Sequence, residues 1–164
     1  MVSQLAEVVI CNHLSHSQLK ELVPDLASIY QRAYKNLPEY REDNHWRIVA
    51  YLSWLWKGDP ESFLVAFLEN EPVGFLGMHI NWREGKEYLA EIHEFVVDPA
   101  FQGKGIGKKL IEEAIRIALS RGRKKIELWV GEKNQKAREF YLHEGFQEKD
   151  QRGKWIRMIK EAEP

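Results

Sequence analysis

A glycine-rich segment in the middle of the chain has the composition of an anion-binding loop. It reads Gln102-Gly103-Lys104-Gly105-Ile106-Gly107-Lys108. The segment follows an apolar stretch that ends at Val97 and opens an amphipathic stretch that runs to about Arg121. Glycine lets backbone amides approach a ligand closely, and the first turn of a helix adds unpaired N–H groups and a positive dipole end. We therefore predict that this segment binds a pyrophosphate.

Three interpretations of this loop compete. A dinucleotide-binding fold requires G-x-G-x-x-G directly after the first strand, but the glycines here are spaced G-x-G-x-G and several predicted strands come first. A nucleoside-triphosphate loop requires G-x-x-x-x-G-K-[S/T], whereas Gly107-Lys108 is followed by Lys109. A turn without a ligand is disfavoured, because glycine is costly where no backbone approach requires it.

The hydrophobic pattern predicts that a mixed sheet positions this loop. Strands are expected at 5–11, 62–68, 73–82, 88–97, 125–130, 146–150 and 154–160. Helices are expected at 24–36, 43–57, 107–121 and from Asn134 to near Gly145, with Pro24 at a first helical position and Asp43 and Asn134 as N-caps. The order β-α-α-β-β-β-α-β-α-β-β predicts an α/β fold with a mixed, mostly antiparallel sheet flanked by helices.

Composition narrows the class of protein. The chain has 164 residues, of which 44% are hydrophobic, so one domain is expected. A net charge of −1 argues against nucleic-acid or anionic-membrane partners. Neither a membrane span nor a signal peptide is expected, and the single cysteine, Cys11, excludes an internal disulfide, so a cytoplasmic location is predicted. Cys11, His13 and His16 would splay apart along a strand and loop, so no metal site is expected.

Two spaced motifs resemble those of the GNAT superfamily of acetyl-CoA-dependent N-acetyltransferases. One is Gln102-x-x-Gly105-x-Gly107 after Val97-Asp98-Pro99, and the other is Asn134 with Tyr141 and Gly145-Phe146. The likeness covers about 88–122 and 125–148, while the first 60 residues agree only in the order of elements. It implies a GNAT-like fold, a single acetyltransferase domain over 1–164, and acetyl-CoA as cosubstrate. The acceptor would be a primary amine of a small molecule or protein, attacking the thioester directly, and a homodimer is a further expectation.

The resemblance also assigns roles to individual residues. The backbone of Phe95, Val96 and Val97 would pair with the pantetheine arm as an added strand, with the Val97 amide polarising the thioester. The segment from Gln102 to Lys108 would hold the pyrophosphate, and Asn134 would hydrogen-bond the cofactor arm. Tyr141 would protonate the coenzyme A sulfur, since its phenol is a neutral donor at pH 7. Helical spacing alone favours a core role for Tyr141, whereas its spacing from Asn134 favours catalysis.

The reaction needs a base, because an alkylamine with a pKa near 10.4 is neutral in only about one molecule in 2,500 at pH 7. The strand at 88–97 offers Glu91, His93 and Glu94, and alternation places Glu91 and His93 on one face and Glu94 on the other. Glu91 falls where the histone-acetylating branch carries its base, and we rank Glu91 first, His93 second and Glu94 third. In branches that modify ribosomal-protein N-termini the base lies on the next strand, where this chain has Trp129.

The acceptor site and the activity itself leave alternatives open. Candidate walls for an amine are the aromatic residues Tyr40, Trp46, Trp54, Trp56 and Trp82. Acids that would attract a cation are Glu39, Glu42 and Asp43. The competing interpretation is that the tryptophans belong to the core and the acids to an exposed loop. Alternatives to N-acetylation are a non-catalytic acyl-CoA-binding or sensing module, transfer of another acyl group, or transfer to an oxygen.

Overall fold

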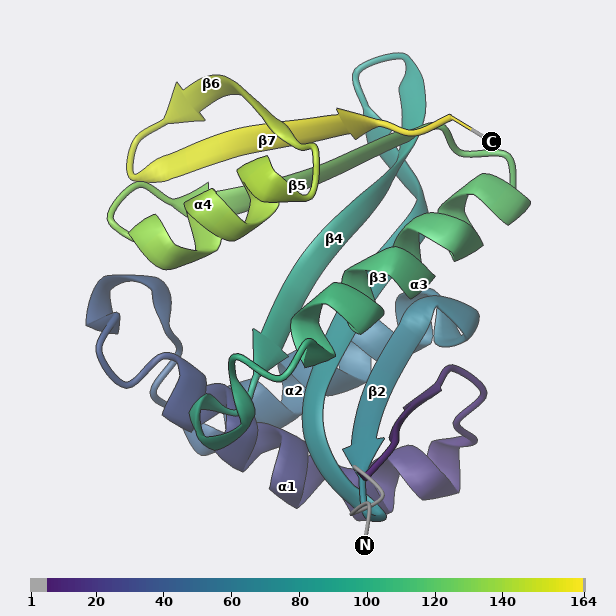
Figure 1. Cartoon of the computed structure of the whole chain (residues 1–164), viewed down its shortest axis with the longest axis vertical. Helices are drawn as coiled ribbons and strands as arrows, with labels where there is room; N and C mark the ends of the chain where they lie inside the picture. The colour runs from purple at the N-terminus through teal and green to yellow at the C-terminus, as the bar shows by residue number, and fades with distance from the viewer. Residues whose placement is uncertain (1–5, 164) are drawn as a thin grey trace, which may run out of the picture.

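The computed structural model describes residues 6–163, which form one open sheet with helices on both faces (Figure 1). The strands are β1 Val8–Cys11, β2 Phe63–Leu68, β3 Glu71–Glu84, β4 Glu87–Val97, β5 Lys125–Gly131, β6 Gln147–Arg152 and β7 Trp155–Glu161. The helices are α1 His16–Ala33, α2 His45–Gly58, α3 Ile106–Ser120 and α4 Gln135–His143. Short 3-10 turns occupy Pro38–Tyr40, Pro60–Ser62 and Pro99–Phe101. The predicted order of elements is confirmed.

Within residues 6–163 the sheet contains one parallel pair of strands, and this pair divides the sheet into two parts. Its order is β1-β2-β3-β4-β5-β7-β6, and only β4 and β5 run parallel. Their pairing is confined to residues 90–92 of β4 and 126–128 of β5. Beyond these residues the two strands diverge, as Figure 1 shows. The C-terminal half of β4 therefore presents a main-chain edge that β5 does not cover.

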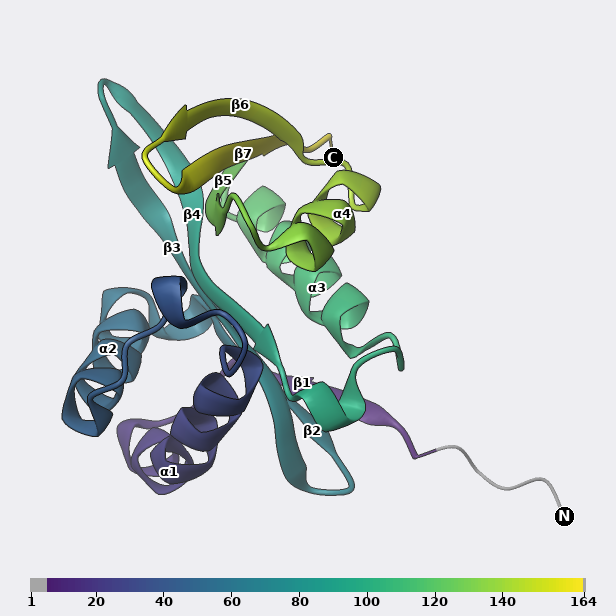
Figure 2. The ribbon, with the colours of Figure 1, turned by 90° about the vertical axis from the view of Figure 1, so that its left-hand side faces the viewer.

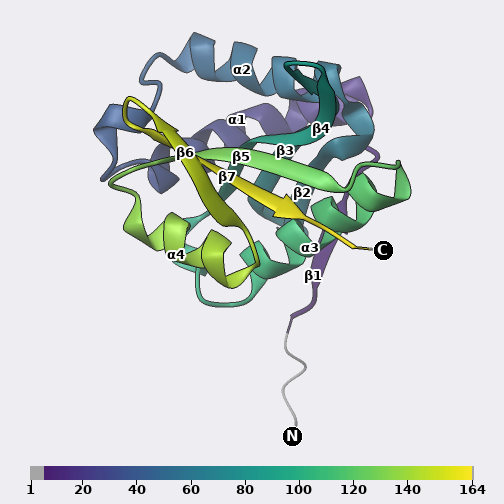
Figure 3. The ribbon, with the colours of Figure 1, turned by 90° about the horizontal axis from the view of Figure 1, so that it is seen from above.

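Two helical layers enclose the sheet. α1 and α2 lie on one face, and α3 and α4 lie on the other (Figures 2 and 3). On the α3 side the predicted apolar stripe is buried, with Leu110, Ile111 and Ala114 fully inaccessible. On the other side Leu52 and Leu55 of α2 are buried against the sheet. The uncovered edge of β4 therefore lies between the two helical layers.

A β-bulge at His93 changes which face the acidic residues of β4 occupy. Glu94 pairs with Gly77 and Ile92 pairs with Met78, so His93 is an extra residue on β4. Strict alternation predicts Glu94 on the face opposite Glu91 and His93, and this prediction is wrong. The bulge shifts the alternation by one residue, so all three side chains lie on the side of α1 and α2.

Two helix starts differ from the sequence prediction. α1 begins at His16 rather than Pro24, because Ser15 and Gln18 form a reciprocal capping box eight residues earlier. Pro24 lies inside this helix. The N-cap of α2 is Asn44 rather than Asp43, since the Asn44 side chain accepts from the Arg47 amide at 3.2 Å. Across residues 6–163 no helix has the length and apolar character needed to traverse a bilayer.

Candidate active site

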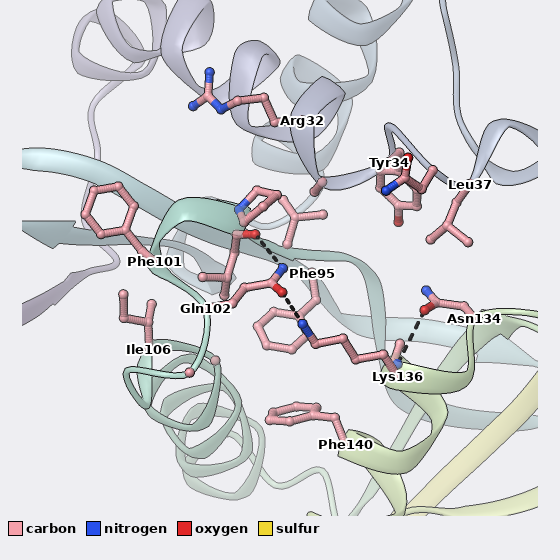
Figure 4. Close-up of a pocket in the computed structure, with 18 of the residues that line it drawn as sticks. Arg32, Tyr34, Leu37, Phe95, Phe101, Gln102, Ile106, Asn134, Lys136 and Phe140 are labelled. Carbon is pink, nitrogen blue, oxygen red and sulfur yellow. Dashed lines mark hydrogen bonds between the residues drawn. The ribbon is translucent and has the colours of Figure 1, made fainter.

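A cavity of about 760 Å³ lies where β4 and β5 separate. Its walls are the end of α1, the C-terminal half of β4, the glycine loop and the start of α4 (Figure 4). It contains most of the predicted cofactor-binding residues, namely Phe95, Val96, Val97, Gln102, Gly103, Gly105, Ile106, Gly107, Lys108 and Asn134. Lys104 does not line the cavity, because its ammonium lies over the Phe101 ring, 5.4 Å from the centroid.

The glycine loop presents main-chain donors to this cavity. Gly103 and Gly105 have φ of 80° and 77°, a left-handed conformation that other residues adopt at a cost. The first backbone hydrogen bond of α3 runs from the Lys109 amide to the Gly105 carbonyl. The amides of residues 106–108 precede it and have no partner within the helix. Their orientation, together with the helix dipole, suits a diphosphate.

The charge of the cavity also matches a polyanion. Five cationic side chains line it: Arg32, Lys35, Lys108, Lys133 and Lys136. Among the described residues that line it, none is an aspartate or glutamate. Asp98 lies just outside and accepts from the Arg32 guanidinium at 2.6 Å. Burial alone would raise the pKa of Asp98, but the hydrogen bond from Arg32 lowers it below its usual value.

The edge of β4 is open to an extended ligand. The Asp98 amide donates to the Val73 carbonyl on β3, so by antiparallel alternation the N–H and C=O groups of Phe95 and Val97 point away from β3, toward the cavity. The Gln102 side chain donates to the Val97 carbonyl at 3.2 Å and accepts from the Lys136 ammonium (Figure 4). Gln102 thus bridges β4 and α4 across the cavity. It occupies the Val97 carbonyl, to which a pantetheine arm would otherwise hydrogen-bond.

A second, smaller cavity of about 60 Å³ joins the first. Both cavities are lined by Tyr34, Phe95, Asn134, Ala137 and Tyr141. The remaining walls of the smaller cavity come from β4, from the ends of β5 and β7, and from the segment before α2. They include Tyr40, His93, Glu94, Trp129, Gly131 and Trp155. The arrangement places a small chamber directly beside the end of the large cavity.

Glu94 is the carboxylate of the small cavity. It is buried, and its Oε1 accepts from the Tyr34 hydroxyl at 2.6 Å and from the Phe95 amide at 3.2 Å. Burial raises its pKa to about 7, although the hydrogen bonds from Tyr34 and Phe95 oppose that rise. At neutral pH Glu94 is therefore present in both protonation states, as a proton-accepting group requires.

Tyr141 lies at the junction of the two cavities. Its ring is buried against Phe95 and Phe146, with centroid distances of 6.1 and 5.8 Å. Burial, and then the charge of Glu94, raise the pKa of Tyr141, so the phenol keeps its proton at neutral pH. Asn134 caps α4 as predicted, since its Oδ1 accepts from the Ala137 amide at 3.3 Å. Tyr141 is therefore a core residue that also lines both cavities.

The other two candidate bases have different surroundings. His93 lies against Trp54 and Trp82, and its Nε2 is 3.1 Å from Nδ1 of His79. Burial, and then His79, lower the pKa of His93 to about 3. Glu91 lines neither cavity.

Glu91 instead faces Glu127 across the parallel strand pair. Burial, and then the hydrogen bond to Glu127, raise the pKa of Glu91. Glu127 in turn is paired with Arg157. One Oε2 on each glutamate is buried without a hydrogen-bond partner among the described residues. This pair is therefore part of the sheet interior rather than of the two cavities.

The predicted acceptor walls are only partly assembled around the small cavity. Tyr40 lines it. Trp46 is 77% exposed, and Trp56 packs against the core and donates to the Leu14 carbonyl, so neither belongs to it. Two aromatic residues that do line it, Tyr34 and Trp155, were not singled out from the sequence. In the sequence, Tyr34 stands out only as part of the apolar stripe of a predicted helix. Trp155 has no feature that indicates a functional site beyond its place at the start of a strand.

Comparison with known proteins identifies the class. Residues 23–146 match the Acetyltransferase (GNAT) family, and the chain belongs to this family. The family uses acetyl-CoA, and the large cavity offers this polyanionic cosubstrate five cationic side chains and the amides of the first turn of α3. A solved neighbour, an N-acetyltransferase from Thermoplasma acidophilum, is in complex with coenzyme A and superposes with a TM-score of 0.76 at 23% identity, over 95% of this chain and 99% of that one.

Two relatives of similar sequence are also named N-acetyltransferases. The chain is 41% identical over 143 residues to an uncharacterized N-acetyltransferase of Methanocaldococcus jannaschii, covering 86% of this chain but only 63% of that protein. It is 39% identical over 124 residues to one from Archaeoglobus fulgidus, covering 74% and 84% of the two chains. A crystal structure of a Pyrococcus horikoshii protein has a TM-score of 0.81 at 35% identity, over 96% of this chain and all of that one.

Proposed function

We propose that the protein transfers an acetyl group from acetyl-CoA to a primary amine by direct attack of the amine on the thioester. The observation that carries this proposal is the junction of the two cavities at Tyr141 and Asn134, with Glu94 in the smaller one. The large cavity accommodates the cosubstrate, and the small one accommodates the reacting end of the acceptor. A nucleophile entering the small cavity meets a base on one side and a phenol on the other.

Residues of the large cavity hold the cosubstrate in an extended conformation. The amides of the glycine loop and the first turn of α3 bind the diphosphate, and the free edge of β4 pairs with the pantetheine arm. Acetyl-CoA supplies an activated acyl group as its thioester. Because the loop follows Val97, the diphosphate lies toward Val97 and the reacting end toward Phe95. We therefore assign polarisation of the thioester carbonyl to the Phe95 amide, in place of the Val97 amide assigned from the sequence; this N–H would be shared between Glu94 Oε1, which accepts from it at 3.2 Å, and the thioester oxygen.

Glu94 acts as the proton acceptor for the attacking amine. Its pKa of about 7 lies near the operating pH, where general-base catalysis is most effective. A pKa of about 3 makes His93 a weak acceptor for the proton of an ammonium. Glu91 does not reach either cavity. This geometry supports Glu94, the third-ranked candidate from the sequence, over both others.

Tyr141 acts as the proton donor for the departing thiolate. It keeps its proton because burial and the nearby Glu94 raise its pKa. Its position on both cavities brings the phenol to the point where the two reactants meet. Asn134 lines both cavities as well, and its side chain also fixes the start of the helix that carries Tyr141.

Coenzyme A release in the presence of a panel of primary amines tests this proposal. The free thiol is followed with a colorimetric reagent, and the acetylated product is identified by mass spectrometry. We expect amine-dependent release well above the rate of thioester hydrolysis. Binding of acetyl-CoA, seen as a thermal shift, with no amine raising the release rate would instead support a non-catalytic acyl-CoA-sensing module.

A further inference from the structure

Two histidines in contact connect the small cavity to the end of α2. His93, the extra residue at the β4 bulge, lines the small cavity. Its Nε2 lies 3.1 Å from Nδ1 of His79 on β3. Nε2 of His79 in turn lies 3.0 Å from the Leu55 carbonyl oxygen of α2. The two imidazole rings therefore join a wall of the candidate active site to the main chain of a helix.

The Leu55 carbonyl determines which nitrogen of each ring carries a proton. α2 ends at Gly58, so the carbonyls of its last four residues have no amide partner within the helix. A carbonyl oxygen only accepts hydrogen bonds, so His79 donates to it from Nε2. In a neutral imidazole the other nitrogen accepts, so Nδ1 of His79 accepts from Nε2 of His93. This order leaves Nδ1 of His93 as an unprotonated acceptor.

The surroundings of the two rings favour their neutral forms. His79 is 8% exposed, and burial, followed by the effect of His79, lowers the pKa of His93 to about 3. Among the described residues the one histidine within ion-pair distance of a carboxylate is His143. Two buried acids of the same region, Glu94 and Asp59, hydrogen-bond a tyrosine and an arginine instead. A proton shared by the two rings would therefore be a buried charge without a counterion, which is unfavourable.

Packing fixes the orientation of both rings. The ring of His93 lies edge-on to those of Trp54 and Trp82, with centroid distances of 4.9 and 4.5 Å. The ring of His79 lies directly on Gly58, where a Cβ would stand 2.2 Å from its Nε2. The absence of a side chain at Gly58 is therefore what allows His79 to reach the last turn of α2.

The remaining nitrogen of His93 is accessible to a ligand. Nδ1 of His93 has no hydrogen-bond partner among the described residues. Within that part of the chain, the buried side-chain atoms without a partner belong to Glu91 and Glu127. Nδ1 of His93 is therefore not a buried atom, although its residue is half-buried and lines the small cavity.

We infer that Nδ1 of His93 accepts a hydrogen bond from an N–H of the acceptor, and that His79 is a positioning residue that holds His93 in the tautomer required for this contact. The inference rests on the proposed function and adds a substrate contact to the same site. Glu94 takes the proton of the amine, whereas His93 gains and loses none and orients the nitrogen for attack.

NMR spectroscopy measures the tautomer directly. Long-range ¹H–¹⁵N correlations in protein labelled with ¹⁵N-histidine distinguish protonated from unprotonated ring nitrogens. At pH 8 we expect His79 and His93 both to carry the proton on Nε2. Saturating n-butylamine, added to the protein with coenzyme A bound, should shift the Nδ1 resonance of His93 but not that of His79. A proton on Nδ1 of His93, or an Nδ1 resonance that the amine does not move, would overturn the inference.

Two variants of His79 separate its two contacts. His79→Asn places an amide oxygen where Nδ1 stands, so it keeps an acceptor for His93 and loses the contact with Leu55. His79→Gln places its amide group near the former Nε2, so it keeps the contact with Leu55 and loses the acceptor. With n-butylamine, or the panel amine with the highest kcat/KM, we expect His79→Gln to lower kcat/KM about 10-fold, the effect of one lost hydrogen bond.

This loss should appear mainly as a higher KM for the amine, and His79→Asn should stay near the wild-type value. Gly58→Ala displaces the ring of His79 without changing the histidine, and should act like His79→Gln. The matched control is His16→Phe, which removes an exposed histidine 5.5 Å from the ring of Trp56 and should leave kcat/KM unchanged. Equal losses in the asparagine and glutamine variants would reduce His79 to a structural role and overturn the inference.

The outcomes distinguish this inference from the function on which it rests. Turnover of the amine with the opposite tautomer of His93 would overturn the inference and leave N-acetylation standing. Bound acetyl-CoA without turnover of any primary amine in the panel would overturn the proposed function, and the NMR titration would still decide whether His93 contacts an amine.

Discussion

Replacing Glu94 by glutamine is expected to abolish most of the activity while making the protein more stable. Glutamine keeps the shape of the side chain and an oxygen that accepts from Tyr34 and Phe95, but it cannot take a proton. Loss of a positioned general base lowers kcat/KM by about 100- to 10,000-fold. The wild-type pH profile should bend near pH 7, the pKa of the Glu94 carboxyl, and the profile of the variant should lack that bend.

The stability effect follows from the same pKa. Burial raises the pKa of Glu94 from 4.5 to about 7, which corresponds to about 3 kcal/mol between the two protonation states. The folded state holds this proton more tightly than the unfolded chain, so wild-type stability falls as the pH rises from about 4.5 to about 7. The Glu94→Gln variant has no such loss. Above pH 7 its free energy of unfolding should exceed the wild-type value by up to about 3 kcal/mol.

Two measurements check these expectations. Urea unfolding at pH 5 and pH 8 gives the stability difference, and steady-state coenzyme A release across the same range gives the pH profile. Glu91→Gln provides the comparison, since it changes a buried carboxyl three residues earlier on β4 that lines neither cavity. If Glu94→Gln retained activity and Glu91→Gln lost it, the base would be Glu91, and the assignment from cavity geometry would be refuted.

Three further tests use Tyr141→Phe, Gly105→Ala with Gly122→Ala as its control, and the stability of Glu91→Gln. Tyr141→Phe should lower kcat by about 100-fold while acetyl-CoA affinity, measured by calorimetry, stays unchanged; equal activity would show that the thiolate leaves without that proton. Gly105→Ala and Gly122→Ala replace glycines with φ of 77° and 81°, and each should lower the free energy of unfolding by about 1–2 kcal/mol. Only Gly105→Ala should weaken acetyl-CoA binding. Equal affinities of the two variants would show that the glycine loop does not bind the cosubstrate. Glu91→Gln should raise the urea midpoint increasingly with pH, because burial and Glu127 raise the Glu91 pKa; a lower midpoint at pH 8 would contradict this.

The order of elements and the place of the glycine loop between β4 and α3 could be predicted from the sequence, because their signals are local. Glycines at 103 and 105 anticipate a left-handed backbone, and Asn134 anticipates a helix cap, since each depends on a few neighbouring residues. The error in the start of α1 was also local. The capping box at Ser15 and Gln18 outweighed Pro24 as the signal for the start of α1.

Tertiary structure alone decided which side chains meet in the small cavity. The bulge at His93 arises from the register between β3 and β4, and it turns Glu94 toward α1 and α2, which no period in the sequence of β4 reveals. Tyr34, Tyr40 and Trp155 come from segments far apart in the chain. They converge because two parallel strands diverge after three paired residues. Sequence patterns record local backbone preferences, whereas such convergence depends on how whole layers pack.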